Sequence, residues 1–93
     1  MEEERATEVV DRLRAGGVMA HLQRAGVFQF GVRVVIPDGR EAIWDTDGAA
    51  GLEATIMRDG ELVGYVPTIP GSETYDVEQT VAAIARADYD APL

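Results

Sequence analysis

Residues 27–36 constrain the fold more than any other segment. Apolar side chains occupy every second position from Phe28 to Ile36, with Gln29 and Arg33 among the residues between them. A period of two is typical of a β-strand that buries one face. The segment ends in Pro37-Asp38-Gly39, three residue types that suit successive positions of a tight turn. The sequence therefore predicts a long strand followed by a hairpin.

The length of that turn decides which face of the next strand is buried. A three-residue loop pairs Val34 with Ala42 and Val32 with Trp44, and thus places Trp44 in the core. A two-residue Asp-Gly loop would slip the register by one residue and bury Ile43 instead. We favour the three-residue loop.

A second hairpin follows, formed by residues 52–58 and 61–66 around an Asp59-Gly60 turn. A two-residue loop leads us to expect cross-strand pairs Arg58 with Glu61, Ile56 with Val63 and Ala54 with Tyr65. Proline at position 67 then stops a central strand.

Helices are predicted before and after these strands in the chain. Apolar residues fall on one stripe of residues 2–14, and Gly16-Gly17 breaks the pattern before a short second helix at residues 18–24. Asp76 and Gln79 form a helix-start signal for a last helix that runs to about residue 88. The predicted fold is one α+β domain over residues 1–93, a four-stranded antiparallel meander with N-terminal helices and a C-terminal helix packed on one face.

Charge narrows the choice of partners. The chain has 17 acidic residues and 8 basic ones, all arginine, for a formal net charge of −9. Residues 47–93 hold nine acids and two arginines, which concentrates the negative charge in that half. Phosphate backbones would be repelled, so we expect no direct nucleic-acid binding and a basic protein as the preferred partner.

No set of residues predicts catalysis, a metal or a cofactor. The absence of cysteine excludes disulfides and thiolate ligands, and His21 is the only histidine. Asp45 and Asp47 resemble the start of a calcium loop, but the glycine comes two positions early. We expect a protein that is not an enzyme. Its apolar runs are too short for a membrane span, so the expected compartment is the cytoplasm.

The strand at residues 27–36 is longer than its hairpin partner, so its first residues would expose unpaired backbone at an apolar edge. Pairing with the last strand, cover by the N-terminal helix or a second copy of the chain would each satisfy this edge, and of these we predict a homodimer formed through this strand.

The stretch from Met57 to Gly71 reads Met-Arg-Asp-Gly-Glu-Leu-Val-Gly-Tyr-Val-Pro-Thr-Ile-Pro-Gly, and Val77-Glu78 lies near the start of the following helix. Residues 52–86 resemble HicB-type antitoxins, in which a hairpin with an acidic, glycine-containing turn leads into a Val-Pro-x-Leu/Ile-Pro-Gly segment and a Glu-rich helix. The resemblance implies a partial RNase-H-like sheet that binds and blocks a small basic RNA-cleaving toxin. The matching positions are Tyr65, Val66, Pro67, Ile69, Pro70 and Gly71.

Two function classes are in keeping with these features. The first is a non-catalytic acidic protein-interaction or regulatory module, with antitoxin-like inhibition as one version. Its expected partner-binding residues are Tyr65, Pro67, Ile69, Pro70, Asp76 and Glu78. The alternative is a small-ligand-binding protein or accessory enzyme subunit, with a pocket between sheet and helices lined by Phe30, Trp44 and Tyr65.

Overall fold

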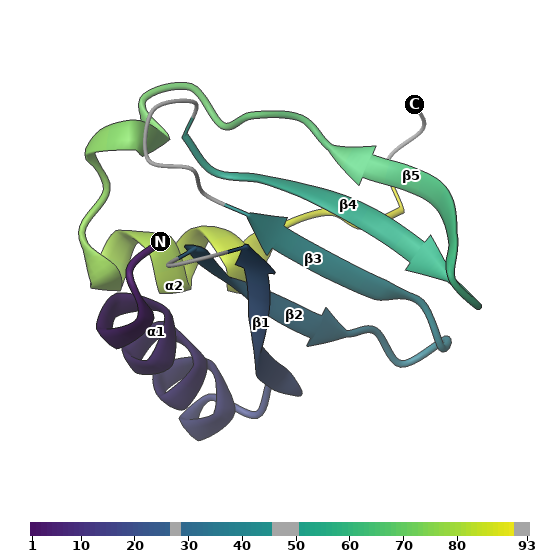
Figure 1. Ribbon diagram of the computed structural model, residues 1–93, viewed down its shortest axis with the longest axis horizontal. Helices are drawn as coiled ribbons and strands as arrows, with labels where there is room; N and C mark the ends of the chain where they lie inside the picture. The colour runs from purple at the N-terminus through teal and green to yellow at the C-terminus, as the bar shows by residue number, and fades with distance from the viewer. Residues whose placement is uncertain (27–28, 46–50, 91–93) are drawn as a thin grey trace.

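The computed structural model describes residues 1–26, 29–45 and 51–90 (Figure 1). Within these residues the sheet runs in the order β1-β2-β3-β4-β5, and every neighbouring pair is antiparallel. The α+β class is therefore confirmed, with a meander of five strands in place of the predicted four. Along the chain the elements are α1 (Glu3–Ala15), β1 (Ala20–Gly26), β2 (Gln29–Val35), β3 (Glu41–Asp45), β4 (Glu53–Arg58), β5 (Glu61–Val66), a 3₁₀ helix η1 (Ser72–Thr74) and α2 (Val77–Arg86).

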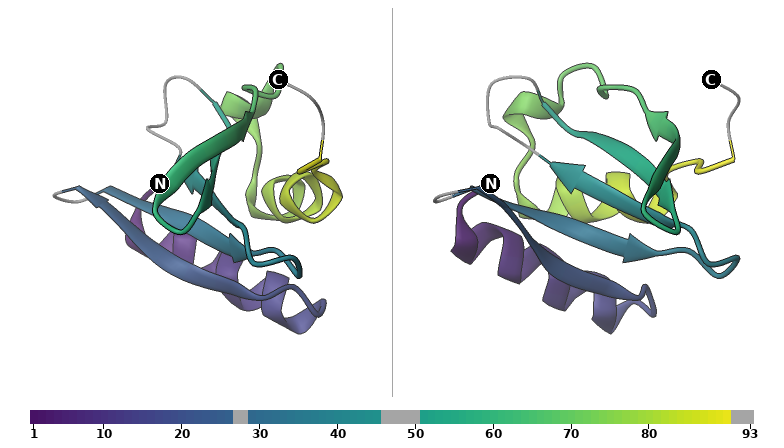
Figure 2. Two further views of the ribbon diagram at one scale, coloured as in Figure 1. Left: turned by 90° about the vertical axis from the view of Figure 1, so that its right-hand side faces the viewer. Right: turned by 45° about the vertical axis from the view of Figure 1, so that its right-hand side comes forward.

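Both helices pack on one side of a strongly twisted sheet (Figure 2). The core between the two layers combines Leu13 of α1 and Ile84 of α2 with strand residues such as Val32, Trp44 and Ile56. No helix among the described residues is long and apolar enough to cross a membrane. The opposite side of the sheet is not covered by either helix.

The first hairpin has the three-residue loop that the sequence favoured. Val34 pairs with Ala42 and Val32 with Trp44. The Gly39 N–H donates to the Ile36 carbonyl at 2.9 Å, and Gly39 has a φ of +96°, a conformation in which glycine is not strained. As a result, Trp44 is completely buried.

The predicted helix at residues 18–24 is wrong, because this segment forms β1. Ala20 pairs with Val34 and Leu22 with Val32. A helix this short is marginal on its own, whereas a strand satisfies backbone groups that β2 would otherwise leave unpaired at its edge.

This strand also pairs the edge of β2 from which a homodimer through residues 27–36 was predicted. Since β2 lies between β1 and β3, both of its edges are already paired within the chain. Residues 27 and 28, where the free edge was expected, lie outside the described residues.

The second hairpin departs from the expected register after its first two pairs, Arg58 with Glu61 and Met57 with Leu62. Arg58 pairs with Glu61 as predicted, but Ile56 then pairs with Gly64 and Ala54 with Val66. The register shift makes Val63 an extra residue, a β-bulge. A regular ladder would have turned the Tyr65 side chain into the apolar core, where its hydroxyl would need a partner.

The helix boundaries follow local signals that the sequence analysis recognised. Gly17, with a φ of +90°, follows the end of α1. At the start of α2, Asp76 Oδ1 accepts from the Gln79 N–H at 2.8 Å, and the Asp76 N–H donates to Gln79 Oε1 at 3.0 Å. This reciprocal capping box confirms the predicted helix start.

Candidate functional site

A shallow hollow of about 310 Å³ lies on the helix-free side of the sheet. Besides Ala54 and Val66, its walls are Ile43 of β3, Glu53 and Thr55 of β4, and Leu62 and Tyr65 of β5. We call the surface formed by these last five residues the hairpin face. The Val63 bulge creates it, because the extra residue allows both Leu62 and Tyr65 to point away from the core.

Apolar side chains are unusually exposed at this surface. Leu62 is 63% exposed and Tyr65 is 52% exposed. The bulge residue Val63, on the same strand, is 45% exposed. Scattered apolar residues on a surface need no explanation, but a group rimmed by polar residues is typical of a binding surface.

The rim of the hairpin face is acidic. The Arg58 side chain lies 3.7 Å from Asp38 and forms no ion pair with its cross-strand neighbour Glu61. Neither Glu61 nor Asp59 has an ion-pair partner among the described residues, and Glu53 accepts only a hydrogen bond of 2.8 Å from the Thr68 hydroxyl. Of the three carboxylates, Glu53 lines the hollow, whereas Asp59 and Glu61 lie at the turn end of β5 next to Leu62 in the chain, and none of the three is ion-paired with an arginine among the described residues.

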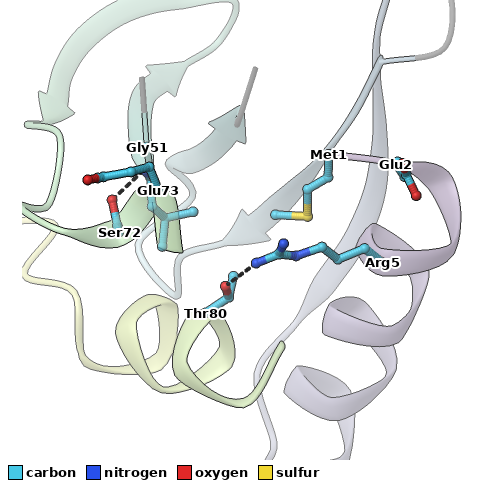
Figure 3. Close-up of a pocket in the computed structure, with 8 residues that line it drawn as sticks. Met1, Glu2, Arg5, Gly51, Ser72, Glu73 and Thr80 are labelled. Carbon is cyan, nitrogen blue, oxygen red and sulfur yellow. Dashed lines mark hydrogen bonds between the residues drawn. The ribbon is translucent and has the colours of Figure 1, made fainter. Parts of the chain in front are cut away.

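A second pocket, also of about 310 Å³, lies where the start of α1 meets η1 and α2 (Figure 3). Met1, Glu2 and Arg5 line one side of it. Its other lining residues are Gly51, Leu52, Ser72, Glu73 and Thr80.

Arg5, Ser72 and Thr80 of this second pocket are already hydrogen-bonded within the protein. Arg5 extends from α1 towards α2 and donates to Thr80 Oγ1 at 3.3 Å (Figure 3), and it also donates to the Tyr75 carbonyl. The Ser72 hydroxyl accepts from the Leu52 N–H and donates to the Ile69 carbonyl, each at 2.6 Å. These bonds link α1 to α2, and η1 to Leu52 just before β4. We therefore assign the pocket a structural role.

The segment after α2 is tied back to the first hairpin. The Arg40 side chain donates to Asp38 at 2.7 Å and to the Tyr89 carbonyl at 2.9 Å, and it also pairs with Asp90. The Arg40 backbone N–H, with the guanidinium beside it, lowers the pKa of Asp38. The hydrogen bonds that the Arg40 guanidinium donates to Asp90 and Asp38 raise the pKa of Arg40.

Tyr89 completes this contact. Its hydroxyl accepts from Trp44 Nε1 at 3.2 Å and donates to the Ile84 carbonyl at 3.0 Å. Burial raises the pKa of Tyr89, although the hydrogen bond from Trp44 acts in the opposite direction.

The structure does not bring the six predicted partner-binding residues to one place. Tyr65 belongs to the hairpin face, whereas Pro67 and Pro70 are exposed in the loop after β5. Ile69 is half-buried against the core, and its N–H donates to Leu52. The last two lie at the start of α2, where Asp76 caps the helix and Glu78 occupies the exposed first turn.

The three aromatic residues of the alternative ligand pocket do not converge either. Trp44 is enclosed on the helix side of the sheet, and Tyr65 lies on the other side. Phe30 is half-buried, with the Arg24 guanidinium 5.9 Å from its ring centre. These residues cannot line one cavity.

Sequence reasoning placed Val63 and Tyr65 on the core face because it assumed a regular ladder, whereas Leu62 keeps the expected pairing with Met57 and was simply not singled out. The bulge reverses the faces of the strand, and its only signal in the sequence is that a regular register would bury the polar Tyr65 hydroxyl. Asp47, part of the calcium-like pattern, lies outside the described residues, and no metal-ligand cluster occurs within them.

Comparison of the chain with protein-family models, curated proteins and solved structures found no match.

Proposed function

We propose that this protein is a cytoplasmic, non-catalytic interaction module that binds a basic protein partner through the hairpin face. The observation that carries the proposal is the exposure of Leu62 and Tyr65 around one hollow, on the side of the sheet that neither helix covers. Burying such side chains against a partner removes apolar area from water and favours association.

The acidic rim supports a partner of opposite charge. Glu53 lines the hollow, Asp59 and Glu61 lie at the turn end of β5, and the whole chain has a formal charge of −9. A basic surface would be attracted at long range and oriented by these carboxylates, while the apolar centre would hold it after contact.

One specific form of this function is neutralisation of a small basic RNA-cleaving toxin, which the resemblance to HicB-type antitoxins implies. The segment that carries the resemblance, residues 57–71, contains all of β5 and therefore Leu62 and Tyr65 of the hairpin face. The proposal of a basic partner does not depend on this form being correct.

Affinity capture from the source cell with two matched variants tests the proposal. Leu62→Ser and Met19→Ser each remove an apolar side chain that is 63% exposed, but only Leu62 lies on the hairpin face. A basic protein should be retained by the unchanged chain and by Met19→Ser, lost with Leu62→Ser, and released as salt is raised. Equal retention of the same protein by both variants would contradict the proposal.

A further inference from the structure

The outer edge of β5 has backbone groups that the sheet does not use. As the last strand in the sheet, β5 pairs only with β4 among the described residues. In an antiparallel ladder, every second residue directs its N–H and C=O away from its partner strand. The edge is therefore able to hydrogen-bond to a further strand.

The opposite edge of the sheet is partly covered. The Ala20 carbonyl of β1 accepts from Arg14 Nε at 2.7 Å, so α1 supplies a side chain to that edge. Along β5, by contrast, no side chain of the described residues hydrogen-bonds to the backbone of Glu61–Val66. Of the two edges, β5 is therefore the one whose backbone receives no hydrogen bond from a described side chain.

Charge and twist determine what kind of strand fits. A second copy would bring another net charge of −9 and a second Glu61 and Asp59 to the same edge. The bulge at Val63 also increases local twist, which hinders edge-to-edge contact between two rigid sheets. A single extended segment is able to follow that twist, and arginine or lysine on it would neutralise the carboxylates.

We propose that the partner contributes an extended, basic strand that pairs with β5 and so adds a sixth strand to the sheet. The inference rests on the proposed function, since it specifies how a partner occupies the same surface. Alternate side chains of the added strand lie over the helix-free side beside Leu62 and Tyr65, so apolar residues are expected at every second position. Basic residues between them lie within reach of Glu61 and Asp59.

A synthetic peptide that alternates valine and arginine provides a defined probe, and its fully N-methylated form keeps the side chains and charge but cannot donate backbone hydrogen bonds. We expect the unmethylated peptide to bind and to slow hydrogen exchange at β5 amides. N-methylation should weaken binding by at least about tenfold, because several backbone hydrogen bonds are lost. A peptide with glutamate in place of arginine should not bind.

The outcomes separate the two proposals. Equal binding of both forms, weakened for both by Leu62→Ser, would overturn strand addition and leave the proposed function standing. If neither form binds the hairpin face, both proposals fail. A concentration-dependent dimer that protects the same β5 amides without peptide would show that a second copy fills the edge, and would likewise overturn the inference.

Discussion

At the scale of single residues, position 51 requires glycine for two reasons, its backbone conformation and the atoms that surround it. Its φ is +88°, and a Cβ built on it would lie 2.7 Å from Ser72 Oγ, the atom that accepts from the Leu52 N–H. Gly60, in the turn between β4 and β5, has a similar φ of +82° but nothing within 4 Å of the same atom. The two glycines therefore separate backbone strain from steric conflict.

We expect Gly60→Ala to lower the free energy of unfolding by about 1–2 kcal/mol, the cost of a left-handed alanine. Gly51→Ala should lower it by about 2–4 kcal/mol, since the new methyl group also displaces a buried hydrogen bond. Urea unfolding measures both values. Equal losses in the two variants would show that the contact with Ser72 has no energetic weight.

Tyr89 links stability to alkaline pH. Its pKa in the folded protein is raised above the ordinary value of 10.0 by burial, so the unfolded chain releases the phenolic proton first. The free energy of unfolding therefore falls as the pH rises above about 10. At neutral pH, Tyr89→Phe should cost about 1–2 kcal/mol, because Trp44 loses its acceptor and the Ile84 carbonyl its donor.

The same substitution should make the alkaline loss of stability less steep. Unfolding followed by the fluorescence of Trp44, the single tryptophan, measures both effects. Tyr65→Phe is the matched control, since the Tyr65 side chain is exposed and its hydroxyl makes no hydrogen bond within the described residues. An unchanged alkaline slope in Tyr89→Phe would contradict this assignment.

At the scale of elements, the cap of α2 distinguishes a structural role from a binding role for Asp76. Asp76→Ala should lower the free energy of unfolding by about 1 kcal/mol, because the Gln79 N–H loses its acceptor. Asp76→Ser retains a capping oxygen, so it should lower the free energy of unfolding by only about 0.2–0.3 kcal/mol. Both variants should still bind the captured partner. If Asp76→Ser abolished partner binding while the fold stayed stable, Asp76 would belong to the interface.

The elements that could be predicted from the sequence are those defined by local signals. The turn at Gly39 and the Asp76–Gln79 capping box each depend on residues within a few positions of one another, and both are confirmed. Residues 20–26 could not be assigned in this way. Their apolar spacing also suits a short helix, and only pairing with β2 makes them a strand.

The candidate site was predictable only in part, for a related reason. Tyr65 was among the expected partner-binding residues, but Leu62 was not. Whether a bulge forms depends on which side chains two paired strands bury, and the residues next to Val63 in the sequence do not indicate one. One extra residue was enough to move Tyr65 from the core side of the sheet to its open side.

At the scale of the whole molecule, the hairpin face and α1 lie at different ends of the sheet (Figure 1). Helix α1 has its own acidic surface, which includes Glu4, Glu8 and Asp11. Charge alone would allow a basic partner to bind at either place. Of these two surfaces, the hairpin face is the one that combines a carboxylate with exposed apolar side chains of an edge strand, and this combination is the basis for choosing it.

Side-chain footprinting of the chain bound to its captured partner tests that choice directly. The account predicts that Leu62 and Tyr65 lose reactivity in the complex, while Met19 and the α1 carboxylates Glu4 and Glu8 react as in the free chain. Protection of the α1 carboxylates with Leu62 and Tyr65 still fully reactive would contradict it.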